Sequence, residues 1–157
     1  MIKDVCYATY VYPVRSNNGI KEFAVLRYPN GYTEYGALGD RLEPCDKDSR
    51  DNLRRELIEE CGQCAAFLAD DAIEIPTHEI LDVPPERINI RKAYKEDHTW
   101  FVVKVSKNIN LKFIEPNKPN ITLVWLPLTQ FLDDKICYNQ DKRAYCEKYI
   151  LPVMKLI

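Results

Sequence analysis

The chain has 157 residues, of which 46% are hydrophobic and 29% are charged, as expected for one soluble globular domain spanning residues 1–157. Its net charge of −2 excludes an overall positive field that would recruit nucleic acid or a membrane. No apolar run approaches the roughly 18 residues of a membrane-spanning helix, and Met1 is not followed by the apolar core of a signal peptide.

The N-terminal part of the chain is predicted to form strands. Aromatic and β-branched residues at Val5–Val14 indicate the first strand, and 21–27 indicate a second, joined to it by a turn at 16–19. Pro29–Gly31 indicates another turn. The segment Tyr32–Leu38 is then expected to form a short strand.

A loop and the central helix follow. Residues 39–47 contain the Gly, Pro and acidic residues of a loop, and residues 49–61 are predicted to be helical. Leu53 and Leu57 share one side of that helix with two cysteines and should be buried. Three residues are candidate N-caps: Asp46, Asp48 and Ser49.

The region after the helix is predicted to return to the sheet. Residues 64–72 could add a short apolar segment, and 73–83 indicate a strand or a strand pair broken at Pro76. The polar, basic segment 84–97 is expected to be a long loop or partly a short strand. Residues 99–105 are the clearest strand in the chain.

The C-terminal part is predicted to mix loop, strand and helix. A loop at 106–120 should surround a short strand at 111–114, and 121–128 should form a strand that leads into a helical turn. Residues 137–156 indicate a C-terminal helix that stops or kinks near Pro152. Strands on both sides of a central helix favour an α/β (α+β) fold with a mixed sheet between helices.

The six cysteines do not indicate a disulfide framework, because the chain is long and has no secretory signal. Cys61 and Cys64 form a CxxC pattern at the end of the helix, without a second pair to complete a zinc site. We expect both to pack as small apolar side chains, and we expect a reducing compartment such as the cytoplasm.

Three carboxylates gather near the end of the predicted helix: Glu56, Glu59 and Glu60. Glu56 and Glu60 are a repelling pair one turn apart, and the negative end of the helix dipole also disfavours acids here. Arg55 can relieve Glu59 but cannot neutralise all three. A hard divalent cation such as Mg²⁺ could do so; the alternative is a solvated acidic face.

The string Arg55–Gly62 resembles the second half of the Nudix box, G-x5-E-x7-R-E-U-x-E-E-x-G-U, in which U is aliphatic. The first half departs from it. Gly39–Pro44 is similar to the usual opening of the box, but Asp40 stands where Gly is expected. Asp46 stands in place of Glu, with eight residues rather than seven before Arg55, and Gln63 replaces the last aliphatic residue.

This resemblance implies a Nudix-like α/β/α sandwich and a hydrolase that cleaves the diphosphate linkage between a nucleoside diphosphate and another group X. It implies Mg²⁺ or Mn²⁺ as cofactor. Glu56, Glu59 and Glu60 would be the catalytic metal-site acids, and Arg55 would orient one of them. The Leu38–Gly39 backbone could offer a carbonyl to the metal.

Other site residues are less specific. Glu96 or Asp97 could act as the general base if their loop reaches the site. Phosphate could be bound by basic residues that could equally be plain surface charge: Arg27, Arg87, Arg91 and Lys92. His78 and His98 are expected to have structural or solvent roles, and one of ten tyrosines could stack on a base.

Several hypotheses about function remain open at this stage. The substrate could be a small nucleotide such as an ADP-ribose-like molecule or a dinucleoside polyphosphate, or a capped RNA end bound along the basic stretch 87–95. The alternatives are a non-catalytic Nudix-fold module that binds nucleotides or proteins, and an unrelated α/β domain with an acidic helix. No membrane partner is expected, and the oligomeric state is undetermined.

Overall fold

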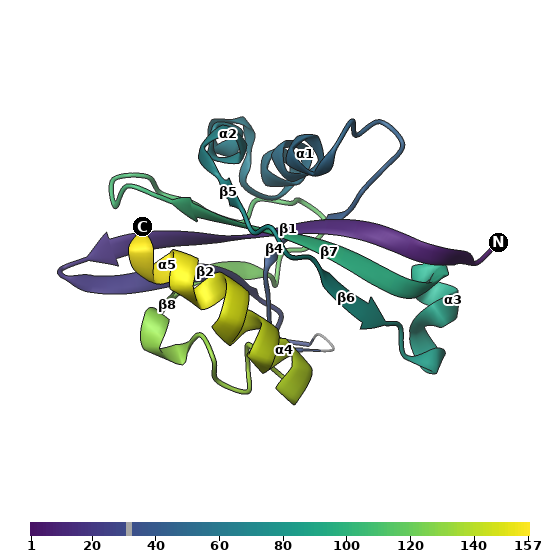
Figure 1. The fold of residues 1–157 in the computed structure, drawn as a ribbon. Coiled ribbons are helices and arrows are strands. Elements are labelled where there is room, and N and C mark those ends of the chain that lie inside the picture. The colour runs from purple at the N-terminus through teal and green to yellow at the C-terminus, as the bar shows by residue number, and fades with distance from the viewer. Residues whose placement is uncertain (31–32) are drawn as a thin grey trace.

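A computed structural model describes residues 1–30 and 33–157 and shows a curled mixed sheet with helices on both faces (Figure 1). Among the described residues the sheet has eight strands: β1 (Lys3–Asn17), β2 (Ile20–Arg27), β3 (Tyr35–Gly36), β4 (Leu38–Arg41), β5 (Ile73–Glu74), β6 (Glu79–Asp82), β7 (Ala93–Lys104) and β8 (Thr122–Pro127). The helices are α1 (Ser49–Cys61), α2 (Leu68–Asp71), α3 (Ile88–Arg91), α4 (Gln140–Tyr145) and α5 (Leu151–Leu156). The α/β/α arrangement confirms the predicted fold class.

Strand β1 is the centre of the sheet. It pairs in parallel with β7 from Lys3 to Val14, and antiparallel with β2 and β4 on its other side. β8 and β3 extend the sheet beyond β2, and β5 and β6 pair with β7. The β1–β2 hairpin turns at Asn18 and Gly19, which both have positive φ as a tight two-residue hairpin requires.

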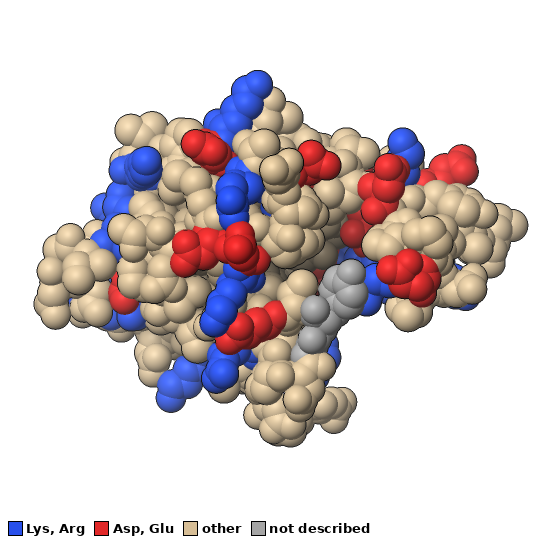
Figure 2. All heavy atoms as spheres, turned by 90° about the horizontal axis from the view of Figure 1, so that it is seen from below, with Lys and Arg blue, Asp and Glu red and all other residues tan. Residues whose placement is uncertain are grey.

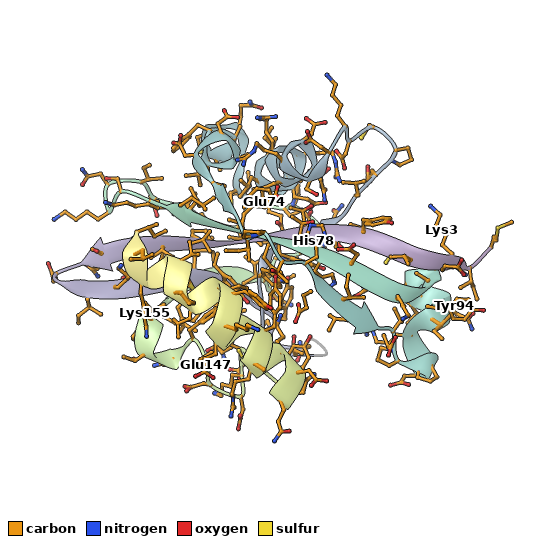
Figure 3. All side chains as sticks on the ribbon, viewed as in Figure 1. Lys3, Glu74, His78, Tyr94, Glu147 and Lys155 are labelled. Atoms are coloured by element: carbon orange, nitrogen blue, oxygen red, sulfur yellow. The ribbon has the colours of Figure 1, made fainter. Side chains whose placement is uncertain are left out.

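Two hydrophobic cores lie on opposite faces of the sheet. On one face α1 and α2 pack Leu53, Leu57 and Leu68 against Phe101 of β7. On the other face the C-terminal helices pack against Trp100 and its neighbours from β1 and β2. Adjacent residues of β7 face opposite cores because side chains alternate along a strand. Charged residues such as Glu147 and Lys155 occupy the solvent side of the C-terminal helices (Figure 3).

Four local predictions are wrong. Residues 39–41 belong to β4 rather than to a loop, because β4 pairs with Ala8–Val11 of β1. Part of 84–92 forms short helices, α3 and a 3-10 turn at Pro85–Arg87. Residues 111–114 are not a strand, and Leu111 instead packs into the core beside α1. Cys64 is exposed, because Gly62 ends the helix before it, whereas Cys61 is buried as expected.

Most other elements are confirmed. The strand pair at 73–83 appears as β5 and β6, and the C-terminal helix contains a π turn at Cys146–Ile150, just before Pro152, which has no N–H to donate. The predicted turn and strand at Gly31 and Tyr32 lie outside the described residues. Among the described helices, no helix combines the length and apolar composition needed to cross a membrane.

Candidate active site

The α1 helix is joined to the sheet at Gly39 in β4. The Gly39 N–H donates a 2.8 Å hydrogen bond to Glu60 Oε1. Gly39 has a φ of 122°, and a Cβ at this position would lie 2.0 Å from the Thr9 carbonyl oxygen. Glycine is therefore required here, because only glycine combines this backbone conformation with so close an approach to β1.

Glu56 and Glu60 are buried at this junction, with only 6% and 7% of their surfaces exposed. Burial raises the pKa of Glu60 to about 9 against the opposing effect of the Gly39 hydrogen bond, and the charges of Glu56 and Asp40 raise it further. Burial and Asp40 likewise raise the pKa of Glu56 to about 7. The two carboxyl groups are therefore short of positive charge.

Arg55 is the main cation beside these acids. Its Nε and Nη2 donate two 2.9 Å hydrogen bonds to the two oxygens of Asp46, and its Nη1 lies 3.2 Å from Glu56 and 3.0 Å from Glu59. The Asp46 side chain is 2% exposed, and the Arg55 hydrogen bond lowers its pKa. Asp46, the acid in the degenerate first half of the box, thus holds Arg55 in place. Arg55 in turn positions Glu56 and Glu59.

The N-terminus of α1 is fixed by two further contacts. Asp48 is the N-cap, and its carboxylate accepts a 2.8 Å hydrogen bond from the Asp51 N–H. Buried Asn52 donates to the Asp40 carbonyl oxygen at 3.2 Å. The predicted helix bounds and one of the predicted caps are confirmed, and β4 is tied to both ends of the helix.

The three helix acids are not preassembled as a metal site. Glu59 is exposed and paired with Arg55, and the described residues contain no group of three or more His, Cys, Asp or Glu arranged to hold a metal ion. Glu56 and Glu60 nevertheless match a hard divalent cation in chemistry, since both offer carboxylate oxygens in a region deficient in positive charge.

A cavity of 590 Å³ adjoins the same junction, because Gly39 and Asp40 are part of its lining. Its aromatic residues are Tyr10, Tyr12, Tyr28, Tyr35, Trp100 and Tyr138. Its charged residues besides Asp40 are Asp82, Arg87, Arg91, Glu96 and Lys142. Figure 2 looks onto the face that carries α4 and α5, where acidic and basic side chains are interspersed.

A chain of alternating charges runs along one wall of this cavity, and all of its described members except Glu79 line the cavity. Arg91 donates to Glu96, and His98 lies between two carboxylates, 3.0 Å from Glu96 and 3.5 Å from Glu79. Lys142 Nζ then lies 3.3 Å from Glu79. Burial opposes these charges, but the hydrogen bonds to its two carboxylates raise the pKa of His98.

Glu96, the candidate base, therefore lies in the cavity wall as a stable carboxylate. Burial alone would raise its pKa, but the hydrogen bond from His98 and the charge of Arg91 outweigh burial and lower the pKa to about 2. A group with so low a pKa is a weak proton acceptor. The base role remains a prediction, and the geometry does not favour it.

The remaining candidates are divided between several places. Arg91 and Arg87 line the cavity. Arg27 is exposed, with its Nε 3.8 Å from Glu34, and is not among the described residues that line the cavity. Asp97 pairs with His78 at 2.7 Å, and in Figure 3 His78 lies at the centre of the sheet near α1. No sequence pattern indicated Lys142 or Asn139 as cavity residues, since they lie far along the chain from the box.

Comparisons with known proteins support the fold. No family model matches the chain, and no curated protein matches it in sequence. Among solved structures, an Ap4A hydrolase from C. elegans in a binary complex has a TM-score of 0.61 at 17% identity, with 91% of this chain and 93% of that chain covered. The E. coli dihydroneopterin triphosphate pyrophosphohydrolase has a TM-score of 0.64 at 11% identity, with 93% and 95% covered.

A third similar structure is the Nudix domain of Shewanella oneidensis NrtR, complexed with ADP ribose. Its TM-score is 0.61 at 12% identity, with 90% of this chain and 88% of that chain covered. These likenesses extend over nearly the whole chain, well beyond the box itself. The chain therefore has the Nudix fold, as its Arg55–Gly62 string predicted.

Proposed function

We propose that this protein is a metal-dependent hydrolase that cleaves the diphosphate linkage of nucleoside diphosphate derivatives. The observation that carries the proposal is the position of Gly39. Its N–H holds the buried Glu60, and the same residue lines the 590 Å³ cavity. A substrate whose nucleoside occupied the cavity would present its phosphates to the acids of α1.

The similar structures support the same substrate class. Ap4A and ADP ribose both contain a diphosphate linkage attached to a nucleoside, and dihydroneopterin triphosphate carries a comparable linkage on a pterin. A cavity lined by aromatic rings suits the flat heterocycle that these compounds share. Capped RNA ends remain an expectation for this chain, supported only by Arg87 and Arg91.

The helix acids, Arg55 and Asp46 would have different roles in this reaction. Glu56, Glu60 and Glu59 would hold Mg²⁺ or Mn²⁺, which when bound would neutralise phosphate charge and lower the pKa of a water molecule. Arg55 positions Glu56 and Glu59 by its hydrogen bonds to both. Asp46 keeps Arg55 in place through its paired hydrogen bonds.

The test is release of nucleotide products from a panel containing ADP-ribose, Ap4A, nucleoside triphosphates and capped RNA, each with Mg²⁺, Mn²⁺ or EDTA. We expect metal-dependent release from at least one compound and none with EDTA. The Glu60→Gln variant controls for contaminating enzymes, since it should lose the activity while keeping the fold. Release that is unaffected by EDTA would contradict the proposal.

A non-catalytic nucleotide-binding module is the second candidate. It is favoured by the pairing of Glu59 with Arg55 and by the lack of a three-acid group among the described residues. Binding of nucleotides without release of product from any compound, in either metal, would select this candidate.

A further inference from the structure

Asn139 lines the cavity and has a side-chain NH₂ group that can donate hydrogen bonds. It is the N-cap of α4, and its Oδ1 accepts a 2.8 Å hydrogen bond from the Lys142 N–H. This bond fixes the orientation of the amide, because exchanging the oxygen and nitrogen would place a donor against a donor. The NH₂ group is therefore the part of Asn139, a cavity-lining residue, that is left for a ligand.

Lys142 is a second donor on the same turn of the chain and lines the same cavity. Its side chain is 7% exposed, its Nζ lies 3.3 Å from Glu79, and its ammonium sits 4.4 Å from the centre of the Trp100 ring. An ammonium has three N–H donors. Lys142 lines the cavity, whereas its counter-charge Glu79 is not among the described residues that do.

The rings beside these donors suit a flat ligand. Trp100 lies 5.1 Å from both Tyr10 and Tyr12, measured between ring centroids. Among the described residues, the three carboxylates that line the cavity do not pair with Asn139 or Lys142. Glu96 accepts from Arg91 and His98, Asp82 has a side chain that is 86% exposed, and Asp40 adjoins Gly39 at the phosphate end.

We propose that this wall selects a nucleobase with a carbonyl oxygen on its inner edge, guanine or hypoxanthine, over adenine. Guanine presents two acceptors, O6 and N7, which pair well with lysine, whereas adenine presents an amino donor at the same position. Recognition of adenine by asparagine requires the amide oxygen as well as the nitrogen. In this chain that oxygen already accepts the cap hydrogen bond of α4, which turns it toward the helix.

The inference names the base of the substrate class and therefore rests on the proposed function. It is tested by calorimetric titration of the protein with IDP and with ADP, in EDTA so that neither is hydrolysed. The bases of these two nucleotides differ only at C6 and in the proton on N1. We expect IDP to bind at least about tenfold more tightly. Equal binding, tighter binding of ADP, or no binding of either would overturn the inference.

The variant Asn139→Asp sharpens the test. Aspartate is an equally good N-cap, so α4 should remain folded, but the donor NH₂ becomes an acceptor oxygen. The preference for IDP over ADP should fall by about tenfold or more. Asp48→Asn is the matched control, because it makes the reverse exchange at the cap of α1, outside the described lining of the cavity, and should leave the preference unchanged.

Lys142→Met provides the second variant and should also reduce the preference. If this variant fails to fold because Glu79 loses its partner, the preference measured for Asn139→Asp is the deciding result. An unchanged preference in a folded Asn139→Asp protein would overturn the inference. Selective binding of IDP without hydrolysis of any substrate would contradict only the proposed function, and equal hydrolysis of inosine and adenosine substrates would contradict only the base selection.

Discussion

The α1 junction holds two buried glutamates, and the cavity wall holds the buried Glu79 and the partly buried Glu96. The pKa values of the two pairs shift in opposite directions. At the junction the pKa of Glu60 is raised to about 9 and that of Glu56 to about 7. In the wall burial also opposes ionisation, yet the pKa of Glu96 falls to about 2, and that of Glu79 is lowered as well.

The number of cations explains the difference. At the junction, among the described residues, Arg55 alone serves several acids: Glu43, Asp46, Glu56 and Glu59. In the wall, three basic side chains serve two acids, so every carboxylate lies between donors. Each carboxylate of the wall has basic side chains beside it, whereas the junction is short of positive charge that a metal ion would supply.

The largest effect on stability should come from removing a charge from the cavity wall. Replacing Glu79 by Gln leaves buried Lys142 without its counter-charge, which should reduce the free energy of unfolding by about 3 kcal/mol. Chemical denaturation would measure this. Asp134→Asn removes the exposed partner of Arg143 and is the control that should change little. A similar small change for both variants would mean that the wall does not depend on its charges.

At the junction the expected effect is on activity instead. Glu60→Gln keeps the shape but removes a charge that a metal would need, so hydrolysis should fall by at least about 10²-fold. The melting temperature should not fall, because the Gln amide oxygen can still accept the Gly39 hydrogen bond. Unchanged turnover would place the metal elsewhere, and a large loss of stability would show that this glutamate resembles those of the wall.

Asp46 belongs to the junction by its position but resembles the wall acids in its pairing with a cation. It lies in the loop before α1 but, like the wall acids, it is saturated by a cation, Arg55. Asp46→Asn should therefore lower hydrolysis by less than Glu60→Gln does. Asp48→Ala is the companion control, which should cost about 1 kcal/mol of stability through loss of the cap. If Asp46→Asn matched the Glu60→Gln loss, Asp46 would be a direct metal ligand.

The smallest expected effect is the pH dependence of the wall. The pKa of His98 is raised in the folded protein, so its contribution to stability is complete below its unfolded pKa of about 6.5. That contribution is lost as the pH rises through the folded value. The stability difference between the wild type and His98→Gln should therefore shrink as the pH rises above about 6.5. A constant difference would show that His98 stays neutral between its two carboxylates.

The sequence was sufficient for the features that depend on neighbouring residues. Asp48, Gly62 and the Leu53/Leu57 stripe determine where α1 begins, where it ends and which side it buries. Strand alternation and the Asn18–Gly19 turn determine the first hairpin. The Arg55–Gly62 string was specific enough to predict the fold, because its helix acids and glycine occur at fixed spacing within two turns.

Only the tertiary structure decided which charges meet. Asp46 reaches Arg55 despite the extra residue between them, since the loop folds back onto the helix. The wall combines residues from β6, β7 and α4, which lie up to 63 positions apart in the sequence. Burial and the supply of cations are properties of such long-range packing. Glutamates are therefore candidate metal ligands at the α1 junction but ion-pair partners in the cavity wall.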